Sequence, residues 1–159
     1  MSIYFYKSYN NDGYLNNLYP SPFTVDGINF INIEQYFVCK KVMLFDPELE
    51  PLILSTKDPK EMQKIAVSVK NYKDAEWLAK RYDIMKEGLY HKFSQNPTLQ
   101  NKLMWTGNSR IVNADPKDLI WGIGITAVEA LMNVPWRGEN LLGEALIEVR
   151  SMFPPVFIY

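Results

Sequence analysis

The chain of 159 residues has a single cysteine, Cys39, and a single histidine, His91. One cysteine cannot form an internal disulfide, and it excludes zinc sites that use several cysteines. One histidine excludes histidine-rich metal centres and most Ser/His/Asp catalytic arrangements. We therefore expect no metal and no cofactor, and chemistry carried out by carboxylates, lysines and amides.

An excess of charge of either sign is also missing. Seventeen Lys and Arg residues balance eighteen Asp and Glu residues, and no polybasic run occurs. Long-range attraction to nucleic acid or to an anionic membrane is therefore not expected, although one or two local cations can still bind a small anion. The apolar stretches are too short to span a bilayer and the first residues lack a signal-peptide pattern, so we expect a soluble cytoplasmic protein.

Hydrophobic residues make up 47% of the chain and charged residues 22%, the balance of an ordinary globular protein. A chain of this length fits one compact domain, which we expect over residues 1–159. The aromatic share of 14% exceeds the needs of a small core, so some rings are available to line a pocket.

Local signals predict a hairpin near the N-terminus and helices through most of the remaining chain. Asp26-Gly27 supplies the positive φ values of a tight turn between residues 23–25 and 28–30. Asn32 can cap the next helix. We predict helices over residues 33–45, 47–54, 59–69, 74–93, 97–106 and 140–152, and short strands over 110–113 and 119–121, with residues 3–6 also β-prone. The fold class is α+β, a single helix-rich domain with a small antiparallel sheet.

The predicted helix 33–45 is apolar on almost every side, which is typical of a buried helix. Glu34 and Lys41 are seven residues apart, about 700° of helical rotation, so they share one face roughly 10 Å apart. Because burial of an unpaired charge is costly, this pattern indicates a carboxylate and an amine that face a common cavity. The simpler interpretation is that Glu34 stabilises the first turn through the helix dipole and Lys41 is a surface lysine.

Several short motifs follow one another along the chain. After the helix that holds Glu34 and Lys41, the strongest is Asp118-Leu119-Ile120-Trp121-Gly122-Ile123-Gly124. The others are Gly13 to Pro20, the hairpin 23–30, Met85, Lys92-Phe93, Asn96-Pro97, Leu103 to Gly107, Gly138 to Gly143, and Arg150. In their shared order and spacing, these motifs resemble the NADAR (YbiA-like) family over nearly the whole chain.

This resemblance implies an N-glycosidase, a hydrolase that cleaves the bond between a base or base-like amine and a phosphorylated ribose. Members of the family act on ribosylamino-pyrimidine phosphates, which are riboflavin-pathway intermediates, or remove ADP-ribose from guanine. The expected partner is thus a small phosphorylated riboside or an ADP-ribosyl substrate, and a nucleic acid only if the substrate is ADP-ribosylated guanine. The oligomeric state stays open.

The same resemblance assigns the site residues. The catalytic positions are Glu34, Lys41 and Asp118, and the substrate-binding positions are Asn16, Asn17, Trp121, Gly122, Gly124 and Asn140. We hypothesise that Lys41, desolvated by apolar neighbours, has a lowered pKa and attacks the opened sugar to form a Schiff base. Glu34 or Asp118 would move protons, and Trp121 would stack on the base or ribose.

Other interpretations of single residues are open. Asp118 ends the turn 115–118, where an aspartate often bonds the backbone, and Trp121 can be a core residue. Two positions depart from the family pattern: Ala66-Val67 replaces a frequent Gly-Arg pair, and Asn113 replaces a common Glu. The cations that would bind phosphate are not fixed by the sequence; the candidates are Arg81, Arg110, Arg137 and Arg150.

Two other functions are compatible with the sequence. Asn113 in place of Glu favours a non-catalytic module that binds ADP-ribose or a related nucleotide. The apolar tail 156–159 is compatible with an interaction protein that uses this tail to dock a partner or its own surface.

Overall fold

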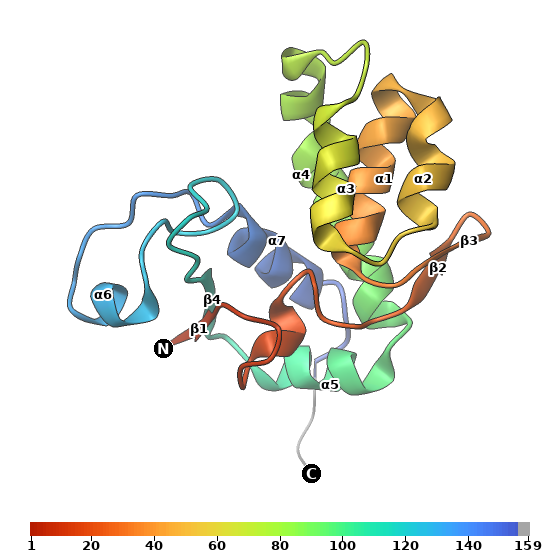
Figure 1. Cartoon of the computed structure of the whole chain (residues 1–159). Helices are drawn as coiled ribbons and strands as arrows, with labels where there is room; N and C mark the ends of the chain where they lie inside the picture. Colours follow the sequence, from red (N-terminus) through yellow and green to blue (C-terminus); the bar gives the residue numbers. More distant parts are fainter. Residues whose placement is uncertain (156–159) are drawn as a thin grey trace. The chain divides into compact units, whose positions relative to one another are not determined.

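The structure, a computed structural model, describes residues 1–155, and these form two compact units (Figure 1). Unit 1 combines Met1–Tyr19 with the chain from Pro97 onward, and unit 2 is the intervening Pro20–Asn96. The tail 156–159, the candidate docking segment, lies outside the described residues. Within residues 1–155, no helix has both the length and the hydrophobicity needed to cross a membrane.

Unit 2 is a helical bundle with one hairpin. In order along the chain, it contains β2 (Phe23–Val25), β3 (Ile28–Phe30), α1 (Ile33–Phe45), the 3₁₀ helix η2 (Pro47–Leu49), α2 (Glu50–Leu54), α3 (Pro59–Val67) and α4 (Asp74–Ser94). Strands β2 and β3 pair antiparallel across Asp26 and Gly27, whose φ angles of 51° and 80° are those of the predicted tight turn. Helix α1 contacts α2, α3 and α4, so it is the central helix of the unit (Figure 1).

The start of α1 is fixed by reciprocal capping, of which the sequence predicts the Asn32 part. The Asn32 side chain accepts a hydrogen bond from the Gln35 amide at 2.9 Å, and the Gln35 side chain accepts one from the Ile31 amide at 2.9 Å. Tyr36 then lies on the core face of α1, with no exposed surface. Its ring packs so closely on α4 that a Cβ at Gly88 would lie 2.4 Å from it.

Unit 1 is built around a pair of parallel strands. Its elements are β1 (Ser2–Phe5), the 3₁₀ helix η1 (Gly13–Leu15), α5 (Pro97–Trp105), β4 (Arg110–Asn113), α6 (Ala127–Leu131) and α7 (Leu141–Arg150). Strands β1 and β4 pair from Ser2 with Arg110 to Phe5 with Asn113. Helix α7 packs against β4, and a hydrophobic cluster that includes Val112 and Ile123 lies beside the sheet.

The predicted α+β, helix-rich fold class is confirmed, and so are the hairpin and the main helices. The β1–β4 pair is parallel, a topology that the sequence did not predict. The predicted strand 119–121 is wrong, because that segment forms bends whose carbonyl groups bond to the start of α7. Helix α6 was not predicted, although Thr126 and Glu129 form the capping box that signals its start.

Candidate functional site

Helix α1 presents Glu34, Phe37 and Lys41 on one face, since they are three and seven residues apart. The three side chains are neither fully buried nor fully exposed. This face differs from the core face that carries Tyr36, so its charged groups escape full burial. The predicted pairing of a carboxylate and an amine on one helix face is compatible with this placement.

The Lys41 amine lies near two aromatic rings. Its Nζ is 5.1 Å from the centroid of the Tyr72 ring and 5.5 Å from that of Trp77, and Trp77 also contacts Phe37 with ring centroids 5.1 Å apart. Partial burial lowers the pKa of Lys41 below its ordinary value. The cause of the lowered pKa is desolvation by burial, which disfavours the charged ammonium form. Lys41 is therefore an amine that loses its proton more readily than a surface lysine does.

The Glu34 side chain is oriented by a hydrogen bond from a neighbouring helix. The side-chain amide of Gln63, on α3, donates a hydrogen bond to Glu34 Oε1 at 2.6 Å. Glu34 also lies in the first turn of α1, where the helix dipole stabilises an anion. Both interactions favour a carboxylate with a defined orientation, which suits stabilisation of positive charge.

A second amine of unit 2 is fully buried. Lys92, on α4, has no exposed surface, and its Nζ lies 5.2 Å from the centroid of the Phe93 ring. Burial lowers the pKa of Lys92 to about 7. A side chain without exposed surface cannot reach a substrate in this conformation, so Lys92 is a structural lysine with an unusual protonation equilibrium.

In unit 1, Asp118 makes two bonds to the backbone of its own loop. Its Oδ1 accepts hydrogen bonds from the Ile120 amide at 2.9 Å and from the Trp121 amide at 2.8 Å. This is the turn geometry that an aspartate often adopts. Its second oxygen makes no hydrogen bond or ion pair with any residue of the described part of the chain. The carboxylate is therefore held in a fixed orientation with one oxygen left over.

The Asp118–Gly124 loop is bonded to the start of α7 by its backbone. The amides of residues 139–142 donate to carbonyl groups of residues 119–122 at 3.0 to 3.1 Å. The amides of Leu141 and Leu142, the first residues of α7, are thus already used, although free amides at a helix start commonly bind phosphate. Trp121 keeps a partly exposed side chain at the centre of this loop.

Gly122 and Gly124 make this close packing possible. A Cβ at Gly122 would lie 2.9 Å from the Asp118 carbonyl oxygen, and Gly124 has a φ of 71°. Gly138, on the opposite segment, would place a Cβ 2.3 Å from the Gly122 carbonyl oxygen. The close approach in this structure is between two backbone segments, and the predicted approach to a ligand stays a prediction.

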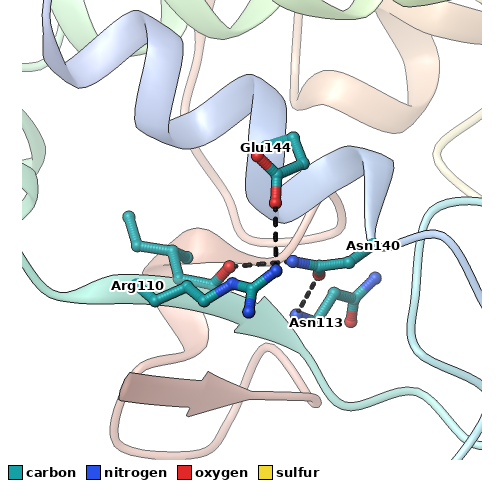
Figure 2. Close-up of polar contacts among 5 residues, drawn as sticks. Arg110, Asn113, Asn140 and Glu144 are labelled. Carbon is teal, nitrogen blue, oxygen red and sulfur yellow. Dashed lines mark hydrogen bonds and ion pairs between the residues drawn. The ribbon is translucent and has the colours of Figure 1, made fainter. Parts of the chain in front are cut away.

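Asn140 acts on strand β4 (Figure 2). Its side-chain oxygen accepts a hydrogen bond from the Asn113 amide at 2.8 Å, and its side-chain nitrogen donates to the Ile111 carbonyl at 3.1 Å. Asn140 has no exposed surface and a φ of 57°. Figure 2 also shows the ion pair between Arg110 and Glu144, at 3.7 Å. The structure gives Asn140 a structural role; its predicted contact with substrate stays a prediction.

Asn113, where the family commonly has Glu, also bonds within the loop. Its side-chain amide donates to the Trp121 carbonyl at 3.2 Å, and the residue is 6% exposed. A carboxylate at this position has no proton to donate at neutral pH. The Asn113 side-chain amide can therefore make the hydrogen bond to the Trp121 carbonyl that an ionised glutamate could not make.

Asn16 and Asn17 lie just after η1. The Asn16 side chain donates to the Tyr6 carbonyl and accepts from the Leu18 amide at 2.7 Å, so it shapes its own loop. Asn17 differs, because its buried side-chain oxygen has no hydrogen-bond partner within residues 1–155. A buried acceptor without a donor is costly, and the predicted contact of Asn17 with substrate stays a prediction.

Two of the candidate phosphate-binding arginines are engaged elsewhere. Arg150 donates to Thr106 and to the Ser109 carbonyl, each at 2.8 Å. Arg110 lies over the Trp136 ring, 4.5 Å from its centroid, in addition to its ion pair. Sequence reasoning missed Gln63, Tyr72 and Trp77, whose roles depend on contacts with α1 rather than on any local motif.

Comparison with known proteins bears on function. The sequence profile of the NADAR domain matches residues 4–153. An N-glycosidase of Acanthamoeba polyphaga mimivirus is 38% identical over 126 residues, or 77% of this chain and 74% of that protein. An N-glycosidase of Nostoc punctiforme is 27% identical over 152 residues, or 95% of this chain and 92% of that protein.

One further relative is a longer protein, and another similar protein has a solved structure. A riboflavin biosynthesis protein of Vibrio vulnificus is 29% identical over 149 residues, which are 94% of this chain but 38% of that longer protein. The NMR structure of Escherichia coli YbiA has a TM-score of 0.78 at 24% identity, over 96% of this chain and 86% of that one, and it supports the YbiA-like fold. The chain belongs to the NADAR family and is a hydrolase that acts on N-glycosyl bonds.

Proposed function

We propose that this hydrolase cleaves the bond between a base or base-like amine and a phosphorylated ribose, with Lys41 as the nucleophile. The observation that carries the proposal is the Lys41 amine, which is partly buried, has a lowered pKa and shares a helix face with Glu34. The substrates are ribosylamino-pyrimidine phosphates or ADP-ribose on guanine. The name of the Vibrio vulnificus relative favours the first class.

The chemistry begins with protonation of the ring oxygen, which breaks the bond between this oxygen and the anomeric carbon, opens the sugar and leaves an iminium ion between the anomeric carbon and the departing nitrogen. The neutral Lys41 amine adds to that carbon, and the proton lost by the amine moves to the departing nitrogen. The base leaves as its neutral amine, which gives a protonated Schiff base on Lys41. Water then adds to the same carbon and releases the sugar and the lysine.

Two carboxylates are proposed to move protons in this sequence. Glu34 is oriented by Gln63 and stabilises positive charge at the sugar. Asp118 has one oxygen bonded to its loop, so its other oxygen is the one that exchanges a proton. Trp121 stacks on the base or ribose, and the unpaired oxygen of Asn17 accepts a hydrogen bond from a sugar hydroxyl.

Borohydride trapping tests the nucleophile. Purified protein is incubated with phosphorylated ribosides, with and without sodium borohydride, and examined by mass spectrometry. We expect base release without reductant, and a reduced ribose phosphate adduct on Lys41 with it. The variant Lys41→Arg should form no adduct, whereas Lys40→Arg, the adjacent lysine, should form it normally. Base release that persists in Lys41→Arg would refute the mechanism.

A non-catalytic nucleotide-binding module is the alternative considered from the sequence. The relatives named as N-glycosidases argue against it. Tight binding of an ADP-ribosyl nucleoside, without base release from any phosphorylated riboside, would favour it.

A further inference from the structure

The Lys41 amine of unit 2 contacts aromatic rings and has no polar partner. Within residues 1–155, its Nζ forms no hydrogen bond or ion pair, and it lies 5.1 Å from the Tyr72 ring centroid and 5.5 Å from that of Trp77. Trp77 is 7% exposed and Tyr72 is 42% exposed, so Tyr72 is the ring on the solvent side. Because a lysine stem is flexible, these rings are the contacts that restrict where the amine can lie.

Tyr72 belongs to the loop 68–73, which joins α3 to α4 and is attached to the end of α1. Asp46, the C-cap residue of α1, accepts a hydrogen bond from the Lys70 amide at 3.2 Å through its Oδ2. Asn71 follows with a φ of 60°, a left-handed conformation that asparagine adopts more readily than most residues. The loop is therefore held at a defined place beside the last turns of α1.

The Tyr72 side chain is held from two sides. Its hydroxyl donates to Asp74 Oδ1, in the first turn of α4, at 2.9 Å. Its ring packs on Phe45 of α1, with the centroids 5.2 Å apart and the ring planes at 67°, a favourable edge-to-face arrangement. Although Tyr72 is partly exposed, its ring thus has a defined orientation over the Lys41 amine.

The environment of Lys41 favours a neutral amine through burial. Charged residues occur on the other helices packed against α1, among them Glu50 on α2, Lys64 on α3 and Glu76 on α4, but burial alone lowers the pKa of Lys41. Tyr72 covers the amine on its solvent side, so this ring contributes to the burial. A lysine must be neutral to attack carbon, which gives the covering ring a chemical consequence.

We propose that the loop 68–73 is a positioning element of the active site, in which the Tyr72 ring holds the Lys41 amine in place and shields it from water. Tyr72 and Asp74 are positioning residues, because they act through Lys41 rather than on the substrate. An amine held in place adds to the sugar faster, since less motion has to be restricted in the transition state. This inference rests on the proposed function, which makes Lys41 the nucleophile.

Competitive acetylation of the full chain tests the shielding without any substrate. Trace acetic anhydride is added over a range of pH values that spans the ordinary lysine pKa, and mass spectrometry measures labelling of Lys41 relative to the exposed Lys64. In Tyr72→Ala, the pH of half-maximal Lys41 labelling should rise, because loss of the ring weakens the desolvation that lowers the pKa. Tyr90→Ala, at a tyrosine of α4 that is 41% exposed, should leave it unchanged. A midpoint that stays or falls in Tyr72→Ala would overturn the inference.

Base release measures the positioning. In Tyr72→Ala that urea denaturation shows to be folded, kcat at pH 7 should fall at least about tenfold with little change in KM, because a misplaced nucleophile slows the chemical step rather than binding. The loss should be smaller at pH 9, since a more exposed amine needs a higher pH to lose its proton. A purely structural role would not produce this pH dependence, so an equal loss at both pH values would overturn the inference.

Two milder variants keep the ring and test its attachment, whether or not Tyr72→Ala folds. Tyr72→Phe and Asp74→Ala each remove the same hydrogen bond, so each should lower kcat about threefold, and the double variant should be no slower. Glu76→Ala, in the same first turn of α4, controls for the helix dipole and should retain activity. Losses that multiply in the double variant would refute a positioning role for this hydrogen bond.

The substrate-free measurement keeps this inference apart from the proposed function. Base release and a borohydride adduct on Lys41, with the same labelling midpoint in Tyr72→Ala as in the native chain, would refute only the role of the loop. A midpoint that rises in Tyr72→Ala, while the native chain releases no base and forms no adduct, would support the shielding of Lys41 and refute the proposed function.

Discussion

Helix α1 and the Asp118–Gly124 loop present their candidate residues in opposite ways. On α1, Lys41 and Glu34 meet other side chains: the rings of Tyr72 and Trp77, and the amide of Gln63. In the loop, Asp118 is bonded to backbone amides, and the backbone itself is bonded to the start of α7. The candidate residues of α1 therefore make few contacts that hold the backbone, whereas the candidate aspartate of the loop also holds the loop backbone in place.

This difference decides how substitutions must be interpreted. A change on the α1 face alters side-chain contacts near the surface, so a loss of activity there reflects chemistry. A change in the loop can remove backbone hydrogen bonds, so activity and stability must be measured together. The predictions below are ordered by the size of the expected effect.

The largest expected effect is at Lys41. Lys41→Met keeps most of the apolar stem but removes the nucleophile, so base release should fall at least 10³-fold, the loss expected when covalent catalysis is removed. The free energy of unfolding, measured by urea denaturation, should change by less than about 1 kcal/mol because the side chain is only partly buried. Lys40→Met is the matched control and should retain activity. A large loss of stability in Lys41→Met would show that Lys41, like Asp118 in the loop, is needed for folding.

Asn140→Ala should have the largest effect on stability. It leaves the Asn113 amide and the Ile111 carbonyl without their partner in a buried region, which should cost about 3 kcal/mol of unfolding free energy. Asn101→Ala, at an exposed position of α5, should cost less than about 0.5 kcal/mol. Urea denaturation of both variants provides the comparison. Similar stabilities would contradict the structural role of Asn140.

Asp118→Asn should separate the proposed role of Asp118 in proton transfer from its role in holding the loop backbone. An asparagine oxygen can still accept from the Ile120 and Trp121 amides, so stability should change by less than about 1 kcal/mol. Base release should fall about 10²-fold because the exchangeable proton site is lost. Asp115→Asn is the matched control, since Asp115 bonds the Lys117 amide in a similar turn. Full activity in Asp118→Asn would assign Asp118 to folding alone.

Lys92 should make stability depend on pH. Its pKa of about 7 in the folded chain lies below the ordinary value of 10.5, so above pH 7 the unfolded chain holds a proton that the folded chain has lost. Stability therefore rises with pH through this window, on the order of 1 kcal/mol per unit from this group. Urea denaturation at pH 7, 8 and 9 should show the rise. It should be absent in Lys92→Met and retained in Lys64→Met, and a flat profile in the native chain would refute it.

The smallest expected effect is at Gln63. Gln63→Ala removes one hydrogen bond to Glu34 at an exposed position, so base release should fall about threefold to tenfold, and stability should change by less than about 0.5 kcal/mol. Lys60→Ala, one turn earlier on α3, should leave activity unchanged. If Gln63→Ala and Lys60→Ala behave alike, Gln63 does not orient the Glu34 carboxylate.

The elements that the sequence predicts correctly depend on neighbouring residues. The Asp26-Gly27 turn and the Asn32 cap need only a few residues of context, so hairpin and helix boundaries follow from local chemistry. The segment 119–121 has a strand-like composition, but its carbonyl groups bond to residues about twenty positions later. No local pattern contains that contact, and the predicted strand was wrong for this reason.

The candidate site likewise combines features that local sequence predicts with contacts between residues distant in the sequence. The shared face of Glu34 and Lys41 follows from helical geometry alone. The rings near Lys41 come from Tyr72 and Trp77, about thirty residues later, rather than from α1 itself, and Gln63 reaches Glu34 from another helix. Gly122 and Gly124 were predicted to let the backbone approach a ligand. In the structure, a Cβ at Gly122 would meet the Asp118 carbonyl oxygen, and a Cβ at Gly124 would meet the Leu119 side chain.

The Asn140 side chain has a further consequence for the behaviour of the protein in concentrated solution. A sheet of only two strands leaves backbone groups along its outer sides, and such groups can recruit a strand from another molecule. The amide of Asn140 occupies one amide and one carbonyl on that side of β4, as an additional strand would. The Ile123 amide bonds the Asn113 carbonyl in the same way, so these backbone groups of β4 are not available to a strand from another molecule.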